Sequence, residues 1–524
     1  MRKRILLQTV FAGMLFAMLS FNSFAQESFF DGKSGFRVRV LDEAAGTVSI
    51  VPVKPIDSPS AYTNIVTIPE TITNGGKTYT IVSIDDSTFM DIQIQEVRLS
   101  NKLKRIGAAN FSWLKNLRTP LVIPDGVEYI GKDSFYRNLE LPSVKIGKGL
   151  TYIADGVFTH NPQVTFEISA ENPYFKYENN ILFKKDCDTL FVYTGEDEKP
   201  VVPATFKHIG GRAFEAKAIK GIQLPEGLES IGNLAFLGCE LLTEITLPAS
   251  VNNIGSNCFF GCFELKNITV AKGNKSYLDD KGALFNIDRT KLIRISSSND
   301  LSLASGKYTV PASVVEIADG AFAQTGFSEF ALPQGLKKVG GYAFHGCVML
   351  RELIFPEQTE NIGMLAAAFC NKLEKVKMGP ATTFIGRSCF YNSPIREMRV
   401  NCATPPEVEL SFIPTFDPTT EARGTLFVPV GTKNLYKNSA GFVGFRYIEE
   451  KDFTAVADVT ATNLAISVSG DQLTLTLDEP QPITIYDLSG RSIATSEATT
   501  SFSYTLPKGT YIVRCGDKVT RVVM

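Results

Sequence analysis

The chain has 524 residues, with 53 basic and 55 acidic side chains and a formal net charge of −2. This balance provides no basic surface for a phosphate backbone, so we expect no nucleic-acid partner. At 44% hydrophobic residues the chain can bury a large core, but it is too long for one ordinary globular domain.

The first 25 residues have the pattern of a signal peptide. A basic segment at residues 2–4 precedes an apolar run at 5–19, and a small-x-small cleavage motif ends at Ala25. We expect cleavage before Gln26 and a secreted or outer-surface protein. No later apolar run is long enough to span a bilayer, so membrane contact is expected only through export or surface attachment.

Residues 26–60 are expected to form a β cap. Segments 36–41 and 47–53 alternate in polarity and are separated by a short polar stretch, which predicts a hairpin. Such a cap covers the end of a stack of strands, because an uncovered edge would pair with another chain.

Residues 61–402 contain a repeat of 23 residues. Pro225 and Pro248 are 23 residues apart, as are Phe236 and Phe259. Each copy has Ile-Gly, then Ala-Phe, then an apolar tail whose last residues alternate as in a strand. A fixed period of this size predicts a solenoid of stacked turns with a continuous apolar ladder, here about eleven turns.

Two insertions, at 170–201 and 271–309, interrupt the repeat. They resemble each other, and each is expected to be a hairpin that lengthens one turn. Asp186, Asp188 and Asp288 lie in their turns but do not make up a calcium ligand set, so no metal site is expected.

The nine cysteines follow the repeat. Cys239 and Cys262 are one period apart, and so are Cys347 and Cys370. In-register neighbours in a ladder lie about 4.8 Å apart with parallel Cβ directions, which disfavours a disulfide. We therefore expect free, buried thiols that pack as small hydrophobes.

The three histidines, His160, His208 and His345, occur in different turns, and no nucleophile, zinc or phosphate-loop motif accompanies them. We expect no enzyme activity, no cofactor and no metal. One turn departs from the aromatic pattern, because Ala367 replaces phenylalanine and Phe369 stands two residues later. Either Phe369 turns into the ladder or a void remains at Ala367.

The C-terminal part divides into three segments. Residues 403–450 are expected to be a cap with one more strand and a short helix near 432–437. Residues 451–462 are small and polar, as in a linker. Residues 463–524 are expected to form a separate, small β-sandwich.

The repeat motifs Ile-Gly-x-x-Ala-Phe and Cys-x-x-Leu-x-x-Ile-x-Leu-Pro resemble the BspA-like leucine-rich repeat family over residues 30–450. The resemblance implies a mostly β, right-handed leucine-rich repeat solenoid, displayed or secreted by bacteria and here of the Bacteroidetes. Members with a known role are adhesins for host matrix proteins and glycoproteins, and the family has no catalytic residues. We expect a monomer that binds such partners.

The tail resembles a type IX secretion C-terminal sorting domain. The matching segments are 483–493, 506–513 and 518–524, although Arg521 stands where the family usually has a lysine. The alternative is a retained sandwich without an export function.

A candidate partner-binding face lies on the outward positions of the later turns, where charged residues replace the neutral ones of earlier turns. Its residues are Glu352, Ile354, Lys375, Lys377, Glu397 and Arg399. Three alternatives remain: an ordinary solvated face, binding by the inserted hairpins, and a structural envelope component without a dedicated ligand.

Overall fold

The computed structural model describes residues 28–31, 33–52, 64–185, 188–296, 306–453, 464–515 and 518–524. The expected signal peptide at 1–25 and most of the expected linker at 451–462 lie outside this part. Within it the protein is almost entirely β, with two short helices, α2 (Pro418–Arg423) and α3 (Lys433–Lys437). No helix of the described residues is long and apolar enough to cross a membrane.

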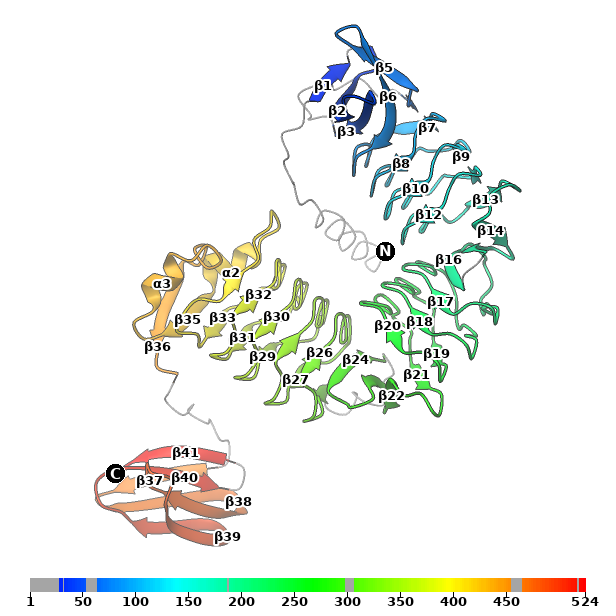
Figure 1. Ribbon diagram of the computed structural model, residues 1–524. Helices are drawn as coiled ribbons and strands as arrows, with labels where there is room; N and C mark the ends of the chain where they lie inside the picture. The colour runs from blue at the N-terminus through cyan, green and yellow to red at the C-terminus, as the bar shows by residue number, and fades with distance from the viewer. Residues whose placement is uncertain are drawn as a thin grey trace.

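The turns stack through two ladders of short parallel strands (Figure 1). In the first, the Ile ladder, each strand ends at the isoleucine or valine that precedes the corner of the turn. Its strands are β8 (Arg105–Ile106), β10 (Tyr129–Ile130), β12 (Tyr152–Ile153), β17 (His208–Ile209), β18 (Ser230–Ile231), β20 (Asn253–Ile254), β26 (Glu316–Ile317), β28 (Lys338–Val339), β30 (Asn361–Ile362), β32 (Phe384–Ile385) and β34 (Glu407–Val408).

The second ladder, the Leu ladder, comes from the apolar tails of the repeat. Its strands are β9 (Leu121–Ile123), β11 (Ser143–Ile146), β13 (Thr165–Ile168), β19 (Glu244–Leu247), β21 (Asn267–Val270), β25 (Lys307–Thr309), β27 (Glu329–Ala331), β29 (Glu352–Ile354), β31 (Lys375–Met378) and β33 (Glu397–Val400). Equivalent residues of neighbouring copies pair directly, as Ile245 does with Ile268. The 23-residue period of the sequence therefore determines which residues of neighbouring strands pair.

The N-terminal strands join the Ile ladder. β1 (Ser28–Asp31), β2 (Phe36–Asp42) and β3 (Thr47–Val51) pair antiparallel, and β3 pairs in parallel with β6 (Lys77–Ile84). The remaining pairs are β5 (Thr71–Asn74) with β6, and β4 (Asn64–Thr67) with β7 (Ile94–Arg98). The first strand of the solenoid sheet is thus covered by the antiparallel strands β1 to β3 and does not form an open edge.

Each insertion adds antiparallel strands at a break in the Ile ladder. The first contains β14 (Phe175–Glu178), β15 (Ile181–Lys184) and β16 (Thr189–Tyr193), and the second contains β22 (Tyr277–Asp280), β23 (Ala283–Asn286) and β24 (Lys291–Ile295). Both have a register irregularity at the same place. β16 and β24 then pair in parallel with the next turn, so the ladder consists of three sheets.

Parallel pairing continues beyond residue 402. β35 (Thr425–Pro429) pairs with β33, and β36 (Tyr447–Lys451) pairs with β35, both in parallel. The segment expected as a cap with one more strand and a short helix near 432–437 therefore continues the parallel pairing of the Leu ladder, and α3 lies where that helix was expected. The side chain of Asp417 accepts a hydrogen bond from the Thr419 N–H at 2.7 Å and so caps α2.

Residues 464–524, where described, form an antiparallel unit. Its strands are β37 (Leu464–Ser469), β38 (Gln472–Tyr486), β39 (Ser492–Thr505), β40 (Thr510–Cys515) and β41 (Lys518–Val523). Leu473, Ile483 and Val513 are among its fully buried residues. That these strands pack as a sandwich stays a prediction.

A column of phenylalanines runs through the solenoid core. Phe89, Phe111, Phe135 and Phe158 stack in nearly parallel pairs with ring centroids 5.1–5.5 Å apart. A second series contains Phe214, Phe236 and Phe259, and a third begins with Phe322 and Phe344. The insertions thus divide the core into three segments.

The corner that follows each Ile-ladder strand has a fixed backbone shape. The third and seventh residues after the isoleucine have positive φ, as Asp133 (56°) and Arg137 (59°) do after Ile130. The glycine of each Ile-Gly pair allows the turns to touch, since a Cβ at Gly232 would lie 2.5 Å from the Gly211 nitrogen. These glycines serve chain packing.

This corner shape explains Phe369. It occupies the seventh position after Ile362, has φ of 59°, and packs in a second apolar cluster against His345 and Tyr391. The expectation that Phe369 turns into the ladder is therefore wrong, because the left-handed backbone directs it to the other cluster. Trp113 occupies the same position in its own turn and belongs to the same cluster.

A column of polar donors lies three residues after the aromatic position. Each donates to the main-chain carbonyl of the aromatic position in the preceding turn, at 2.8–3.2 Å. This donor column consists of Asn138, Asn161, Cys239, Cys262, Cys347, Cys370 and Ser393. The four cysteines are therefore hydrogen-bond donors as well as small apolar groups.

The thiols of the described residues are free and buried, and Cys187 lies outside that part. Burial raises the pKa of Cys262 to about 12 and that of Cys347 to about 11. The thiolate is the reactive form of cysteine. At neutral pH these thiols are therefore protected from reagents because they are both buried and protonated.

We expect a thiol reagent to label the native mature protein slowly, because the thiols are buried and protonated. In denaturant without reductant, absorbance of the released reporter should count all nine cysteines. A count of seven or fewer in denaturant would demonstrate disulfides and contradict this reading of the cysteine ladder.

Candidate functional site

The six candidate residues lie together on the exposed side of three adjacent strands. Glu352 and Ile354 on β29 are in register with Lys375 and Lys377 on β31. These are in turn in register with Glu397 and Arg399 on β33. The intervening residues Leu353, Val376 and Met398 are buried, so strand alternation directs all six outward.

The same face continues onto β35 and β36. Thr425 and Phe427 follow Glu397 and Arg399 in register, and Tyr447 and Glu449 follow on the last strand. We call the whole set the C-terminal face, which comprises Glu352, Ile354, Lys375, Lys377, Glu397, Arg399, Thr425, Phe427, Tyr447 and Glu449. Sequence reasoning missed Phe427 and Tyr447, although the alternation in Thr425–Pro429 is a usable signal.

Charges of both signs occupy this face. Arg399 forms an ion pair with Glu397, whereas neither Lys375 nor Lys377 has an acidic partner within 4 Å among the described residues. Exposed pairs in water contribute little to stability. The two lysines therefore leave positive charge available for a partner.

Apolar surface accompanies these charges. Ile354 is 45% exposed and Tyr447 is 46% exposed. Phe427 is half-buried, with the Lys451 ammonium 5.7 Å from the centre of its ring. Exposed aromatic and aliphatic groups within a charged rim are typical of protein-binding surfaces.

The corresponding positions of earlier strands differ in chemistry. On β19 and β21 the hydroxyls of Thr246 and Thr269 hydrogen-bond to each other at 2.8 Å, and Glu244 faces Asn267. Charged pairs also occur on other strands of the Leu ladder, Lys145 with Glu167 on β11 and β13 and Lys307 with Glu329 on β25 and β27. Mixed charge is therefore not confined to the later turns, and the neutral stretch is limited to the threonine pair of β19 and β21.

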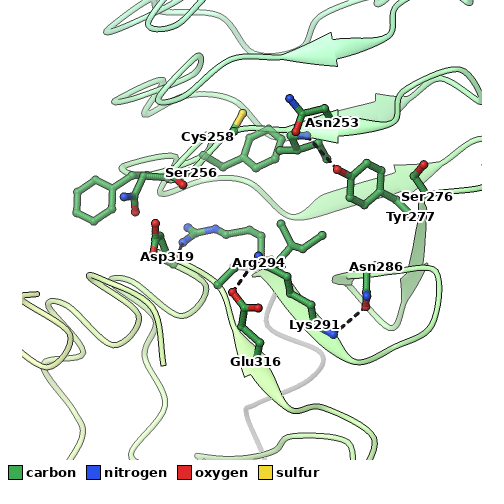
Figure 2. Close-up of a pocket in the computed structure, with 18 of the residues that line it drawn as sticks. Asn253, Ser256, Cys258, Ser276, Tyr277, Asn286, Lys291, Arg294, Glu316 and Asp319 are labelled. Carbon is green, nitrogen blue, oxygen red and sulfur yellow. Dashed lines mark hydrogen bonds and ion pairs between the residues drawn. The ribbon is translucent and has the colours of Figure 1, made fainter. Parts of the chain in front are cut away.

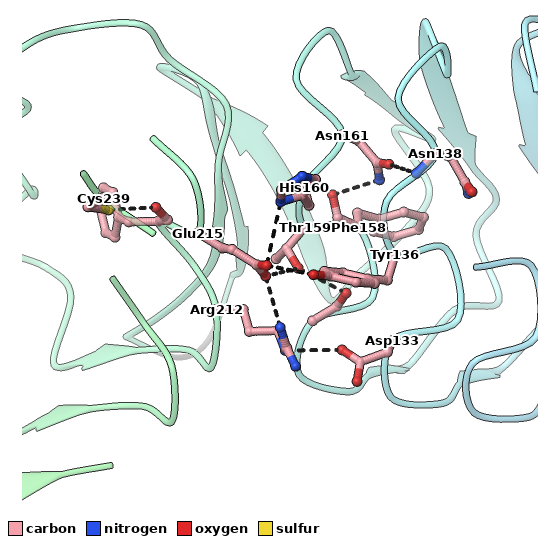
Figure 3. A network of polar contacts seen from close by, with 12 residues as sticks. Asp133, Tyr136, Asn138, Phe158, Thr159, His160, Asn161, Arg212, Glu215 and Cys239 are labelled. Atoms are coloured by element: carbon pink, nitrogen blue, oxygen red, sulfur yellow. Dashed lines mark hydrogen bonds and ion pairs between the residues drawn. The ribbon is translucent and has the colours of Figure 1, made fainter. Parts of the chain in front are cut away.

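An acid–base cluster that the sequence did not reveal lies at the first insertion (Figure 3). The carboxylate of Glu215 is buried and accepts hydrogen bonds from the Tyr136 hydroxyl at 2.7 Å and from Arg212 Nη1 at 3.2 Å. His160 Nδ1 is 3.5 Å from Glu215 Oε1, and Arg212 Nε is 3.4 Å from Asp133 Oδ1. The cluster joins turns before the insertion to the turn after it.

The two acids of this cluster are affected in opposite directions. Burial acts to raise the pKa of Glu215, but Arg212, His160 and Tyr136 together hold that pKa below its ordinary value. Burial raises the pKa of Asp133, with Arg212 only partly opposing it. The ion pair with Glu215 is thus the stronger contact of Arg212.

The contacts of this cluster favour a structural role, in which it holds together the turns on the two sides of the insertion, over a role as an active site. It borders a cavity of about 190 Å³, but both Glu215 oxygens already accept hydrogen bonds from protein groups. No group of three or more His, Cys, Asp or Glu in the described part of the chain is arranged to hold a metal. A general base needs a free oxygen and a bound substrate within reach.

We expect Glu215→Gln to destabilise the solenoid by about 3 kcal/mol, because it leaves the buried Arg212 charge without its main partner. The pKa of Glu215 is lowered on folding, so its stabilisation is complete above its ordinary value of 4.5 and is lost as pH falls through the folded-state pKa. Thermal unfolding between pH 3 and 7 measures both effects.

Asp133→Asn is the matched control. It removes an acid whose pKa is raised on folding, so the melting temperature should fall less than for Glu215→Gln. Equal losses for the two variants would contradict the assignment of Glu215 as the main partner of Arg212.

Comparison with known proteins places this geometry in a family. The model of the BspA type leucine-rich repeat region matches in six copies, over residues 82–190, 184–302 and 298–405. A search of curated proteins found no match.

Several solved structures are similar to the chain. A leucine-rich cell surface protein of Faecalibacterium prausnitzii is 19% identical, with a TM-score of 0.40 over 82% of this chain and 96% of that one. The pneumococcal vaccine antigen PcpA is 18% identical, with a TM-score of 0.37 over 82% and 100% of the two chains. A leucine-rich repeat protein of Eubacterium ventriosum is 18% identical, with a TM-score of 0.36 over 75% and 97%.

The family match spans more than half of the chain and coincides with the stacked turns that the structure shows. The chain belongs to the BspA-type leucine-rich repeat proteins.

Proposed function

We propose that this protein is an exported, non-catalytic binding protein whose C-terminal face takes an extended protein or glycoprotein of the extracellular environment. The observation that supports this most is a combination on one set of paired strands. It consists of exposed Ile354, half-buried Phe427, and Lys375 and Lys377, which have no acidic partner within 4 Å among the described residues. Leucine-rich repeats of this kind are typically interaction scaffolds without catalytic groups.

The geometry of the array suits a long partner. Adjacent strands lie about 4.8 Å apart, so five strands in register offer matching rows of side chains over roughly 20 Å. A partner that crosses the strands meets apolar contacts at Ile354 and Phe427 with charges on either side. In such surfaces the apolar groups contribute most affinity, whereas rim charges chiefly raise the association rate.

The triple substitution Ile354→Glu, Lys377→Glu and Arg399→Glu should abolish binding, because it reverses two charges and removes an apolar contact. All three residues are exposed or half-buried, so the melting temperature should stay nearly unchanged. The mature chain would be tested on an array of immobilised matrix proteins and plasma glycoproteins.

Thr246→Glu combined with Thr269→Lys is a matched control, because it adds charges at equivalent positions of β19 and β21. That variant should bind as the parent does. If the triple variant retains binding to a ligand that the parent captures, the site lies elsewhere. If the parent captures no ligand at all, the structural envelope alternative is favoured.

We further propose that residues 463–524 direct export across the outer membrane, as their resemblance to a type IX sorting domain implies. The five antiparallel strands found there are consistent with an independent unit.

Deleting residues 463–524 should leave the protein in the periplasm. The solenoid should still fold, since its core segments end before residue 450. Protease accessibility on intact cells, with immunoblots of cell fractions, measures the change. Unchanged surface display of the truncated chain would reduce the tail to an accessory domain.

A further inference from the structure

A second, separate feature is a cavity at the second insertion (Figure 2). It has a volume of about 370 Å³ and lies where the Ile ladder breaks between β20 and β24. Pockets of this size lie within the range that holds small ligands. None of the residues of the C-terminal face lines it.

One wall of the cavity contains a buried arginine without an acidic partner. Arg294 is 6% exposed, and its Nη1 donates to the carbonyl oxygens of Gly320 at 2.7 Å and Ala323 at 3.4 Å. Its Nε has no hydrogen-bond partner within the described part of the chain. No ion pair among the described residues includes Arg294, so its charge is left to carbonyl dipoles.

A second unpaired group meets Arg294 at the same glycine. The Oδ1 of Asn257 is buried without a hydrogen-bond partner. A Cβ at Gly320 would lie 2.5 Å from that oxygen, while the Gly320 carbonyl accepts from Arg294. Buried polar groups are normally satisfied, so two open ones around a single cavity make it a candidate site for a group that can bond to both.

The first insertion provides a natural comparison. Its strand β16 has the register of β24, and Val192 occupies the position of Arg294. The arginine of that junction, Arg212, has the buried Glu215 as its partner. In the second junction the positions equivalent to Arg212 and Glu215 are Gly320 and Ala323. Its arginine therefore comes from the inserted strand β24, and no carboxylate stands at the position of Glu215.

The other charges of the cavity leave a net positive balance. Lys291 and Lys338 both lie near Glu316, at 2.9 Å and 3.5 Å. Asp319 accepts a hydrogen bond from the Gly341 N–H at 2.8 Å. Among the described residues that line the cavity, three bases and two acids leave one net positive charge. Arg294 is the buried member of the three bases.

The rest of the lining is hydrogen-bonding and neutral. Asn253, Ser256 and Ser276 supply amide and hydroxyl groups, while Tyr277 and Asn286 already hydrogen-bond to Ile254, Thr290 and Lys291. Such groups suit a ligand with several hydroxyls more than an apolar acid, because polar lining groups must find partners when water is displaced.

We propose that this cavity binds an acidic sugar, with the sugar carboxylate against Arg294 and its hydroxyls against the neutral amide and hydroxyl wall. A planar carboxylate accepts two parallel hydrogen bonds from a guanidinium, which would use the open Nε. The ligand supplies the negative charge that Glu215 supplies at the first insertion.

The test is calorimetric titration of the full mature chain with glucuronic acid, N-acetylneuraminic acid, glucose and inorganic phosphate. At least one acidic sugar should bind, and glucose should not. Arg294→Val should weaken binding at least tenfold, and it should fold because the first insertion has valine there. Arg289→Ala is the matched control, since Arg289 pairs with Asp280 on the exposed hairpin, and it should bind as the parent does.

A second variant keeps the arginine. Asn257→Asp places a carboxylate at the open oxygen, so it should weaken sugar binding and raise the melting temperature. The proposal is overturned if neither acidic sugar binds, if phosphate binds as tightly as they do, or if Arg294→Val binds normally. A lower melting temperature for Arg294→Val without any sugar binding by the parent would show that Arg294 only supports the Gly320 turn.

Discussion

The solenoid depends on satisfying main-chain carbonyls that stacking removes from water. The corner of each turn bends around the aromatic column, and its left-handed residues interrupt regular strand pairing. The donor column answers this constraint in seven of the turns with one side chain each, bonded to the turn before it. Each bond contributes about 1 kcal/mol, but an unmet buried carbonyl would cost more. Asparagine, cysteine and serine are interchangeable there because each is a small donor.

The two insertions interrupt the regular stacking of turns. The buried charged residues described above lie at these two interruptions. At the first, Glu215 and Arg212 connect the turns on the two sides of the break. At the second, Arg294 has no such partner and a cavity remains. Each repeat is stabilised by its neighbours only. Where the repeat is interrupted, buried polar groups must therefore find hydrogen-bond or charge partners at the junction itself.

The sequence predicted the features that recur in every turn. It did not predict features that depend on contacts made at one place only. The period of 23 residues set the registers of both ladders, and alternation placed Ile354 and Lys377 outward. Phe369 was misjudged, since the sign of φ at its position is a property of the folded corner. Glu215 and Arg294 were missed because Tyr136 and His160, which contact Glu215, and Gly320, which contacts Arg294, come from turns more than twenty residues away. The face itself was found, but its extension to Phe427 required the pairing of β33 with β35.

The buried thiols have a consequence for biogenesis. On the export route proposed above, the chain would meet an oxidising compartment before its turns have stacked, when every cysteine is reachable. Stacking places Cys239, Cys262, Cys347 and Cys370 beside carbonyl oxygens and removes them from oxidants. Wrong disulfides would link neighbouring turns and block that packing. The order of events during export therefore matters: local stacking must outrun oxidation, which the short sequence separation between adjacent turns makes feasible.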